Sequence, residues 1–160
     1  MNQIVQISDV REFMTRHLAD VFDTMLSMKA ILVPQAAVPL FGERVSGSVG
    51  FAGETVTGAV YLHLSAPFAT QVTAAMLGLA PEEITGDTEV NDVVGEATNM
   101  LTGGLKSWLC DAGHQCAVST PAIIRGTGFN VEPMEDVQCE CLVFDCGQDR
   151  LVVEVHIKFN

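Results

Sequence analysis

The sequence predicts an α+β fold in which an antiparallel-rich sheet packs against two long helices and one short helix. Three observations predict it. Two long stretches carry apolar residues at spacings of three and four, other stretches alternate apolar and polar residues or are rich in β-branched ones, and the order is helix, hairpin, two helices, then strands. A length of 160 residues suffices for one hydrophobic core, so we expect a single domain over residues 1–160.

The first long helix is predicted over about residues 8–28, where apolar residues recur every three or four positions. Ser8 or Asp9 is the expected N-cap, because short polar side chains accept hydrogen bonds from the first helical amides. A β-hairpin is predicted over residues 44–64. Its first strand alternates apolar and polar residues, its second is rich in β-branched ones, and residues 52–54 form the turn.

The short helix is predicted to open at Pro67 and to end at Leu77, before Gly78. Proline near a helix start and glycine just past its end are the usual signals. The second long helix is predicted over about residues 89–112 and is closed by Gly113.

Three further strands are predicted near the end of the chain. Apolar, β-branched stretches occupy residues 122–129, 137–146 and 151–159. The last two are separated by Gly-Gln-Asp at 147–149, a short turn signal, so they form a second hairpin.

The composition argues against some binding partners and some cellular locations. The net charge of -12 repels nucleic acid and anionic lipid, so neither is an expected partner. No apolar run has the 18 to 20 or so residues of a spanning helix, and the start of the chain lacks an export signal, so we expect a cytoplasmic protein away from membranes. Five cysteines without a repeating spacing fit reduced thiols.

The second long helix is predicted to have an apolar face and a polar stripe. At 100° per residue the apolar face collects Val93, Ala97, Met100, Leu101, Leu105 and Trp108. The opposite side collects Asp92, Glu96, Asn99, Gly103 and Lys106. A solvent-exposed helix also shows such a stripe, but Gly95, Gly103 and Gly104 each cost about 1 kcal/mol relative to alanine, which a merely solvated face does not require. Gly95 and Gly103 would let a partner approach, whereas Gly104 is expected to pack on the sheet.

Glu96 and Asn99, one turn apart, suit phosphoryl transfer to water. A loose transition state asks mainly for positioning of the water in line, and an uncharged amide can accept a hydrogen bond from that water without repelling phosphoryl oxygens. The carboxylate of Glu96 would contact a cation on the partner.

The stretch Gly95–Gly103, with Glu96 and Asn99 as its Glu-x-x-Asn signature, resembles the CheC/CheX family of chemotaxis phosphatases, more closely its CheX-like branch. The segment Thr120–Gly126 is similar to the Pro-containing strand of that family. The resemblance implies a CheC-like fold and hydrolysis of the aspartyl-phosphate of a CheY-like response-regulator receiver. Asn99 would orient the water and Glu96 would contact a receiver lysine.

In this interpretation the docking contacts come from the rest of the polar stripe and its neighbour, namely Asp92, Gly95, Gly103 and Lys106. The resemblance also implies that this chain binds no cofactor, since Mg²⁺ belongs to the receiver, and that the chain forms a homodimer. The late apolar strands would be exposed edges unless paired between subunits. In the first helix Glu12 is followed three residues later by Thr15, which lacks the amide, so we expect one site per chain.

Other candidate sites are weaker. Cys110, His114 and Cys116 lack a CxxC pair and a fourth ligand, so no metal site is predicted. His17 and His114 are expected at the surface or at helix ends, and the histidines at 63 and 156 in strands without an acidic partner. A noncatalytic signalling domain that uses the polar stripe as a contact surface stays open as an alternative.

Overall fold

The computed structural model describes residues 4–34, 40 and 42–160. The helices are α1 (Ile7–Leu26), α2 (Ala66–Leu77), α3 (Asp87–Asp111) and the 3-10 turn η1 (Pro81–Glu83). The strands are β1 (Ile31–Val33), β2 (Arg44–Ala52), β3 (Val56–Ser65), β4 (Ala117–Val118), β5 (Ala122–Gly126), β6 (Gln138–Cys146) and β7 (Asp149–Phe159). The predicted α+β fold is confirmed.

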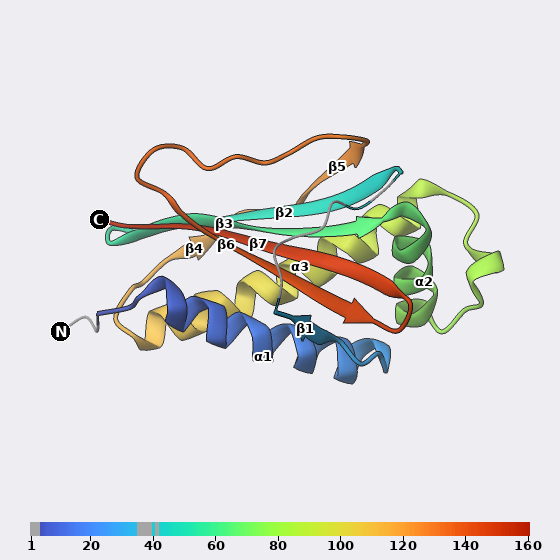
Figure 1. The fold of residues 1–160 in the computed structure, drawn as a ribbon, viewed down its shortest axis with the longest axis horizontal. Coiled ribbons are helices and arrows are strands. Elements are labelled where there is room, and N and C mark those ends of the chain that lie inside the picture. The colour runs from blue at the N-terminus through green and yellow to red at the C-terminus, as the bar shows by residue number, and fades with distance from the viewer. Residues whose placement is uncertain (1–3, 35–39, 41) are drawn as a thin grey trace.

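The described strands form one antiparallel sheet in the order β1-β6-β7-β3-β2-β4, and β5 also pairs with β2. The helices α1 and α3 lie side by side against one face of this sheet, and α2 lies at one end (Figure 1). We call the face under α1 and α3 the helix face and the opposite one the outer face. Both predicted hairpins are present, as β2–β3 and β6–β7.

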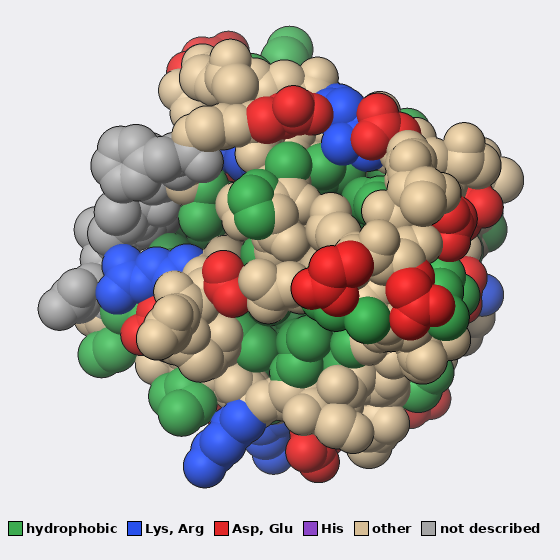
Figure 2. Space-filling model, turned by 90° about the vertical axis from the view of Figure 1, so that its right-hand side faces the viewer, with side chains coloured by type: hydrophobic (Ala, Val, Ile, Leu, Met, Phe, Trp, Pro, Cys, Tyr) green, Lys and Arg blue, Asp and Glu red, His purple; other side chains and the backbone are tan. Residues whose placement is uncertain are grey.

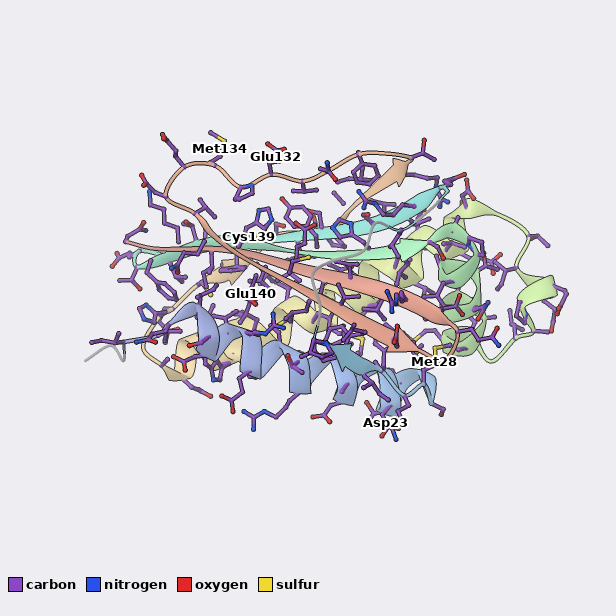
Figure 3. The ribbon with its side chains drawn as sticks, in the orientation of Figure 1. Asp23, Met28, Glu132, Met134, Cys139 and Glu140 are labelled. Carbon is purple, nitrogen blue, oxygen red and sulfur yellow. The ribbon has the colours of Figure 1, made fainter. Side chains whose placement is uncertain are left out.

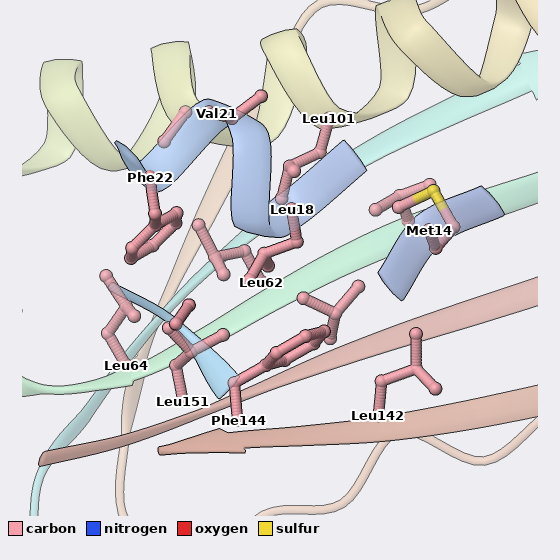
Figure 4. Close-up of a cluster of buried hydrophobic side chains, with 14 of the residues drawn as sticks. Met14, Leu18, Val21, Phe22, Leu62, Leu64, Leu101, Leu142, Phe144 and Leu151 are labelled. Carbon is pink, nitrogen blue, oxygen red and sulfur yellow. The ribbon is translucent and has the colours of Figure 1, made fainter. Parts of the chain in front are cut away.

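The core lies between the helix face and the two long helices (Figure 4). Side chains from α1, α3 and the central strands meet there without solvent access: Met14, Leu18, Phe22, Leu101, Leu62, Leu64, Leu142, Phe144 and Leu151. Burial of each such side chain contributes about 1.5–3 kcal/mol, so this contact fixes α3 against the sheet.

The outer face is crossed by the chain between β5 and β6 (Figure 1). The predicted strand over residues 122–129 is wrong at its end, because β5 stops at Gly126 and Gly128 adopts a left-handed φ of 67°. Phe129 therefore turns back over the sheet, where the guanidinium of Arg44 lies 3.9 Å from its ring centre.

The helix starts differ in detail from expectation. Helix α1 is capped by Gln6, neither Ser8 nor Asp9. Asp9 instead accepts a hydrogen bond from the Gln6 amide at 2.9 Å, because its position in the first turn lets it reach back. Helix α2 agrees with expectation, since Ser65 accepts the Phe68 amide and Gly78 ends the helix with φ 69°.

Acidic side chains are spread over the end of the molecule where α2 lies (Figure 2), in keeping with the net charge of -12. Within the ranges that the structure covers, no helix has the length and apolar character needed to cross a membrane.

Candidate functional site

The polar stripe of α3 faces away from the sheet, as predicted. Asp92 and Glu96 are exposed, while Asn99, Gly103 and Lys106 are half-buried. On the other side Val93, Ala97, Leu101 and Leu105 are buried. Met100 and Trp108, expected on the apolar face, are only half-buried, because they lie at its border with α1, where Trp108 stacks on Phe13.

The side chains of Glu96 and Asn99 are available for a partner. No hydrogen bond or ion pair holds either of them within the part of the chain that the structure describes. Their separation of three residues places them on one helix face about one turn apart. A carboxylate and an amide are thus presented together to whatever docks on α3.

Between these two residues, Thr98 braces α3 against the middle of the sheet. Its hydroxyl donates to the Val94 carbonyl at 2.7 Å, and its side chain is fully buried. A Cβ built on Gly47 of β2 would lie only 2.0 Å from Thr98 Oγ1. The absence of a side chain at position 47 is therefore what allows the site helix to lie this close to the sheet.

Gly104 packs on α1 rather than on the sheet, which corrects its expected role. A Cβ at this position would lie 2.0 Å from His17 Nε2. That ring nitrogen lies 3.1 Å from the carbonyl oxygen of Met100 and is half-buried in the α1–α3 contact. His17 is therefore not a free surface histidine. It links α1 to α3 at Met100, the residue that follows Asn99.

A shallow pocket of about 230 Å³ lies beside Glu96. It is lined by Asn91, Asp92, Gly95, Glu96, Pro121 and Ile123. Gly95 forms its buried floor, and a Cβ there would make ordinary contact, 3.4 Å from Pro121 Cγ. Pro121 lies over one side of Gly95, so the expected contact between Gly95 and a docking partner would be made through this pocket.

Arg125 fixes β5 beside the start of α3. Its guanidinium donates to Asn91 Oδ1 at 2.6 Å and lies 3.4 Å from Glu43 and 3.7 Å from Asp87. Asn91 and Ile123 were not predicted as site residues. The sequence predicted the strand that follows α3. It did not contain the antiparallel pairing of this strand with β2, a long-range contact that places the strand beside Glu96.

Glu12 and Thr15, where a second pair would stand, both lie on α1. Thr15 donates its hydroxyl to the Arg11 carbonyl within α1 at 2.7 Å, and Glu12 lies 3.7 Å from Arg16. Both side chains are thus engaged within α1.

A separate polar cluster lies on the outer face, where sequence reasoning expected none. Glu154 of β7 joins two histidines: its Oε1 lies 3.1 Å from His63 Nε2 and its Oε2 lies 3.0 Å from His156 Nε2. Burial alone would raise the pKa of Glu154, but the hydrogen bonds and charge interactions with the two histidines together outweigh burial and hold that pKa below its ordinary value. The expectation that these histidines lack an acidic partner is therefore wrong.

The trio Cys110, His114 and Cys116 does not form a metal-ligating group among the described residues. His114 lies just past the end of α3, one of the two places expected for it, but it is buried, and its Nδ1 lies 2.8 Å from Thr55 Oγ1. All five cysteines are free thiols.

Solved structures with the same architecture include a chemotaxis protein CheX from Vibrio vulnificus, 24% identical, covering 97% of this chain and 100% of that one, with a TM-score of 0.79. A chemotactic CheC-like protein from Shewanella oneidensis is 28% identical over 92% of this chain and 96% of its own, with a TM-score of 0.74. A CheX from Borrelia burgdorferi, solved in a complex with CheY, BeF3 and Mg²⁺, is 18% identical over 92% and 97%, with a TM-score of 0.71.

No curated protein sequence matches the chain. The family model described as chemotaxis phosphatase CheX, however, matches residues 45–145, which run from β2 through α3 to β6. This span covers well over half of the sequence and includes both Glu96 and Asn99. The chain therefore belongs to the CheX family of chemotaxis phosphatases.

Proposed function

We propose that this protein accelerates hydrolysis of the aspartyl-phosphate on a CheY-like response-regulator receiver. The observation that carries the proposal is the pair Glu96 and Asn99, held on one face of α3 with no hydrogen bond or ion pair to the described residues. Family membership supports it, as does the fold shared with a CheX that was solved in complex with CheY.

Asn99 has the chemistry to position the attacking water. Water attacks phosphorus, the bond to the aspartyl oxygen breaks, and the products are the receiver carboxylate and inorganic phosphate. Because the transition state is loose, the water needs alignment more than deprotonation, and the amide oxygen of Asn99 can accept a hydrogen bond from it. Mg²⁺ in this proposal is held by the receiver.

Glu96 would hold the receiver rather than take part in bond breaking. Its carboxylate is exposed beside the pocket formed with Pro121 and Ile123, so the methylene groups of a receiver lysine would pack there while its ammonium group reaches the carboxylate. Asp92, Gly103 and Lys106 lie along the same stripe and would surround the docked receiver.

The direct test measures the decay of phosphorylated receivers from the same organism, with Mg²⁺ present, with and without this protein. Faster decay with at least one receiver is expected. Unchanged decay for all of them would contradict the proposal. Binding of a receiver without faster decay would support the alternative, a noncatalytic signalling domain that uses the same stripe.

Replacing Glu96 by glutamine is expected to weaken docking more than chemistry. Loss of one charge-assisted hydrogen bond costs about 1.5 kcal/mol, so the protein concentration for half-maximal acceleration should rise about tenfold. The rate at saturating protein should change little, because the removed contact is the same in the ground and transition states. Asp111→Asn removes one negative charge from the exposed end of α3, outside the stripe, and is the matched control. Equal effects of the two variants would show that only bulk charge matters.

Replacing Gly103 by alanine tests whether the receiver lies close to the α3 backbone. A Cβ at this position meets no heavy atom within 4 Å in the chain itself, so the helix should gain about 1 kcal/mol of stability. We expect weaker receiver binding despite this gain. Gly86→Ala, at the N-cap of α3 and also without a heavy atom within 4 Å of the new Cβ, is the control and should leave binding unchanged. If Gly103→Ala binds the receiver as well as the wild type, position 103 lies outside the docked surface.

Three further expectations belong to this proposal: one domain, one site per chain, and a homodimer. The late apolar strands were expected to be exposed edges that pair between subunits. This is wrong for β7, which lies inside the sheet, between β6 and β3. On its other side β6 pairs with β1 over Val143–Asp145, and no described strand pairs with that edge over Gln138–Leu142. This stretch is where edge pairing between two copies would occur, and light scattering of the purified protein measures the state.

A further inference from the structure

We propose that Cys139, Glu154 and His156 bind a zinc ion on the outer face of the sheet, a site independent of the proposed phosphatase function. Among the described residues these three form a group whose ligand atoms all lie within 4.8 Å of one another. They come from two hydrogen-bonded strands, so the sheet backbone, and no loop, sets their positions.

The register of β6 and β7 accounts for this proximity. Cys139 pairs directly with His156, and Glu154 lies two positions before His156 on β7, on the same face. Figure 3 shows Cys139 on the side of β6 toward the crossing segment and Glu140 on the opposite side, toward α1. Glu140 pairs there with Arg11 of α1, which fixes the register and leaves Cys139 on the outer face.

Movement of the Cys139 side chain toward Glu154 and His156 is the main adjustment that a tetrahedral zinc ion would require. Zinc bonds of about 2.0–2.3 Å place the ligand atoms about 3.3–3.7 Å from one another. Glu154 Oε2 and His156 Nε2 already lie 3.0 Å apart. Cys139 is exposed, so rotation of its side chain can bring Sγ inward, whereas the half-buried Glu154 and the buried His156 are held in place.

Residues behind Glu154 orient it as the supporting residues of metal ligands do. His63, only 1% exposed, donates from Nε2 to Glu154 Oε1, and its Nδ1 lies 2.6 Å from the hydroxyl of the fully buried Ser46. The contact with Ser46 restrains the orientation of the His63 ring. Glu154 Oε1 is thus occupied, and Oε2 faces His156 and the proposed ion.

The mixture of donors favours zinc over magnesium or calcium. Thiolate and imidazole ligands suit zinc, whereas magnesium and calcium take oxygen ligands. A thiolate and a carboxylate would together neutralise the two positive charges of the ion. Cys141 pairs with Glu154 on the same face and lies next to the site, and a water molecule would complete the coordination.

The test is titration of the untagged, reduced full-length protein with Co²⁺ and with Zn²⁺. Cobalt should bind one ion per chain with a thiolate-to-metal absorption band and the intense visible bands of tetrahedral coordination, and zinc should displace it. Cys139→Ser should abolish the thiolate band and weaken zinc binding at least tenfold, because a ligand contributes no less than a supporting residue. Since Cys139 is exposed, this variant should fold.

Two variants make the result decisive. Cys110→Ser removes a thiol from the trio Cys110, His114 and Cys116, away from the proposed site, and should leave the metal titration unchanged. Ser46→Ala, which acts only through His63 and Glu154, should weaken zinc binding about tenfold and retain the thiolate band. Absence of one-to-one binding, or binding that Cys139→Ser does not alter, would overturn the proposal.

Discussion

Replacing Asn99 by alanine is expected to lower the acceleration of receiver dephosphorylation about 100-fold at saturating protein, because a misplaced water loses that factor. Binding of the receiver should be nearly unchanged, since Glu96 and the rest of the stripe remain. The fold should also remain, because the half-buried Asn99 side chain makes no hydrogen bond with the described residues. Phosphoryl decay and receiver binding measured on the same samples separate the two effects.

Asn99→Asp sharpens this experiment. It keeps the shape of the side chain and adds a negative charge, which repels the phosphoryl oxygens at the position proposed for the amide. The aspartate variant should therefore be as slow as the alanine variant. Retention of wild-type activity by either one, with the fold intact, would show that another residue positions the water.

Replacing Gly47 by alanine is expected to lower the free energy of unfolding by about 3 kcal/mol. The new Cβ would overlap Thr98 Oγ1 at 2.0 Å and would lie 3.2 Å from the Val94 carbonyl oxygen, which the helix backbone holds in place. Unfolding in urea measures the loss. Because Thr98 lies between Glu96 and Asn99, the surviving folded protein should also have lower phosphatase activity.

Gly50→Ala is the matched control in the same strand. A Cβ there would meet Ser119 Oγ at 3.6 Å and the Gly58 carbonyl at 3.7 Å, both ordinary contacts, so little stability should be lost. Combining Gly47→Ala with Thr98→Ala removes the overlapping hydroxyl and should recover part of the stability. If the double variant is merely the sum of the two single ones, Thr98 is not the group that excludes a side chain at position 47.

The elements that carry the proposed chemistry were predictable because local pattern determines them. The stripe of α3 follows from helical periodicity, and the hairpin β2–β3 from alternation and its turn. The very short strands β1 and β4 were missed, since two or three residues carry no period.

What surrounds the pair Glu96 and Asn99 depends on contacts between distant parts of the chain, which local pattern does not contain. Pro121 lies over one side of Gly95 only because β5 pairs with β2, and Glu154 reaches His63 only because β3 and β7 are neighbours. Gly104 shows the same limit of local pattern. Its helical angle correctly predicted a contact inside the protein, but the contacting residue is His17 of α1 and not a residue of the sheet.

Adjacent residues of β2 serve opposite surfaces of the sheet. Gly47 lies under the site helix, whereas Ser46, its neighbour in sequence, supports His63 on the outer face. A scan of substitutions along this strand should thus alternate with a period of two, with odd positions altering receiver signalling and even ones altering the chemistry of the opposite face. Substitutions in this one strand could then change receiver signalling and the chemistry of the outer face separately, although the residues that control them are adjacent in the sequence.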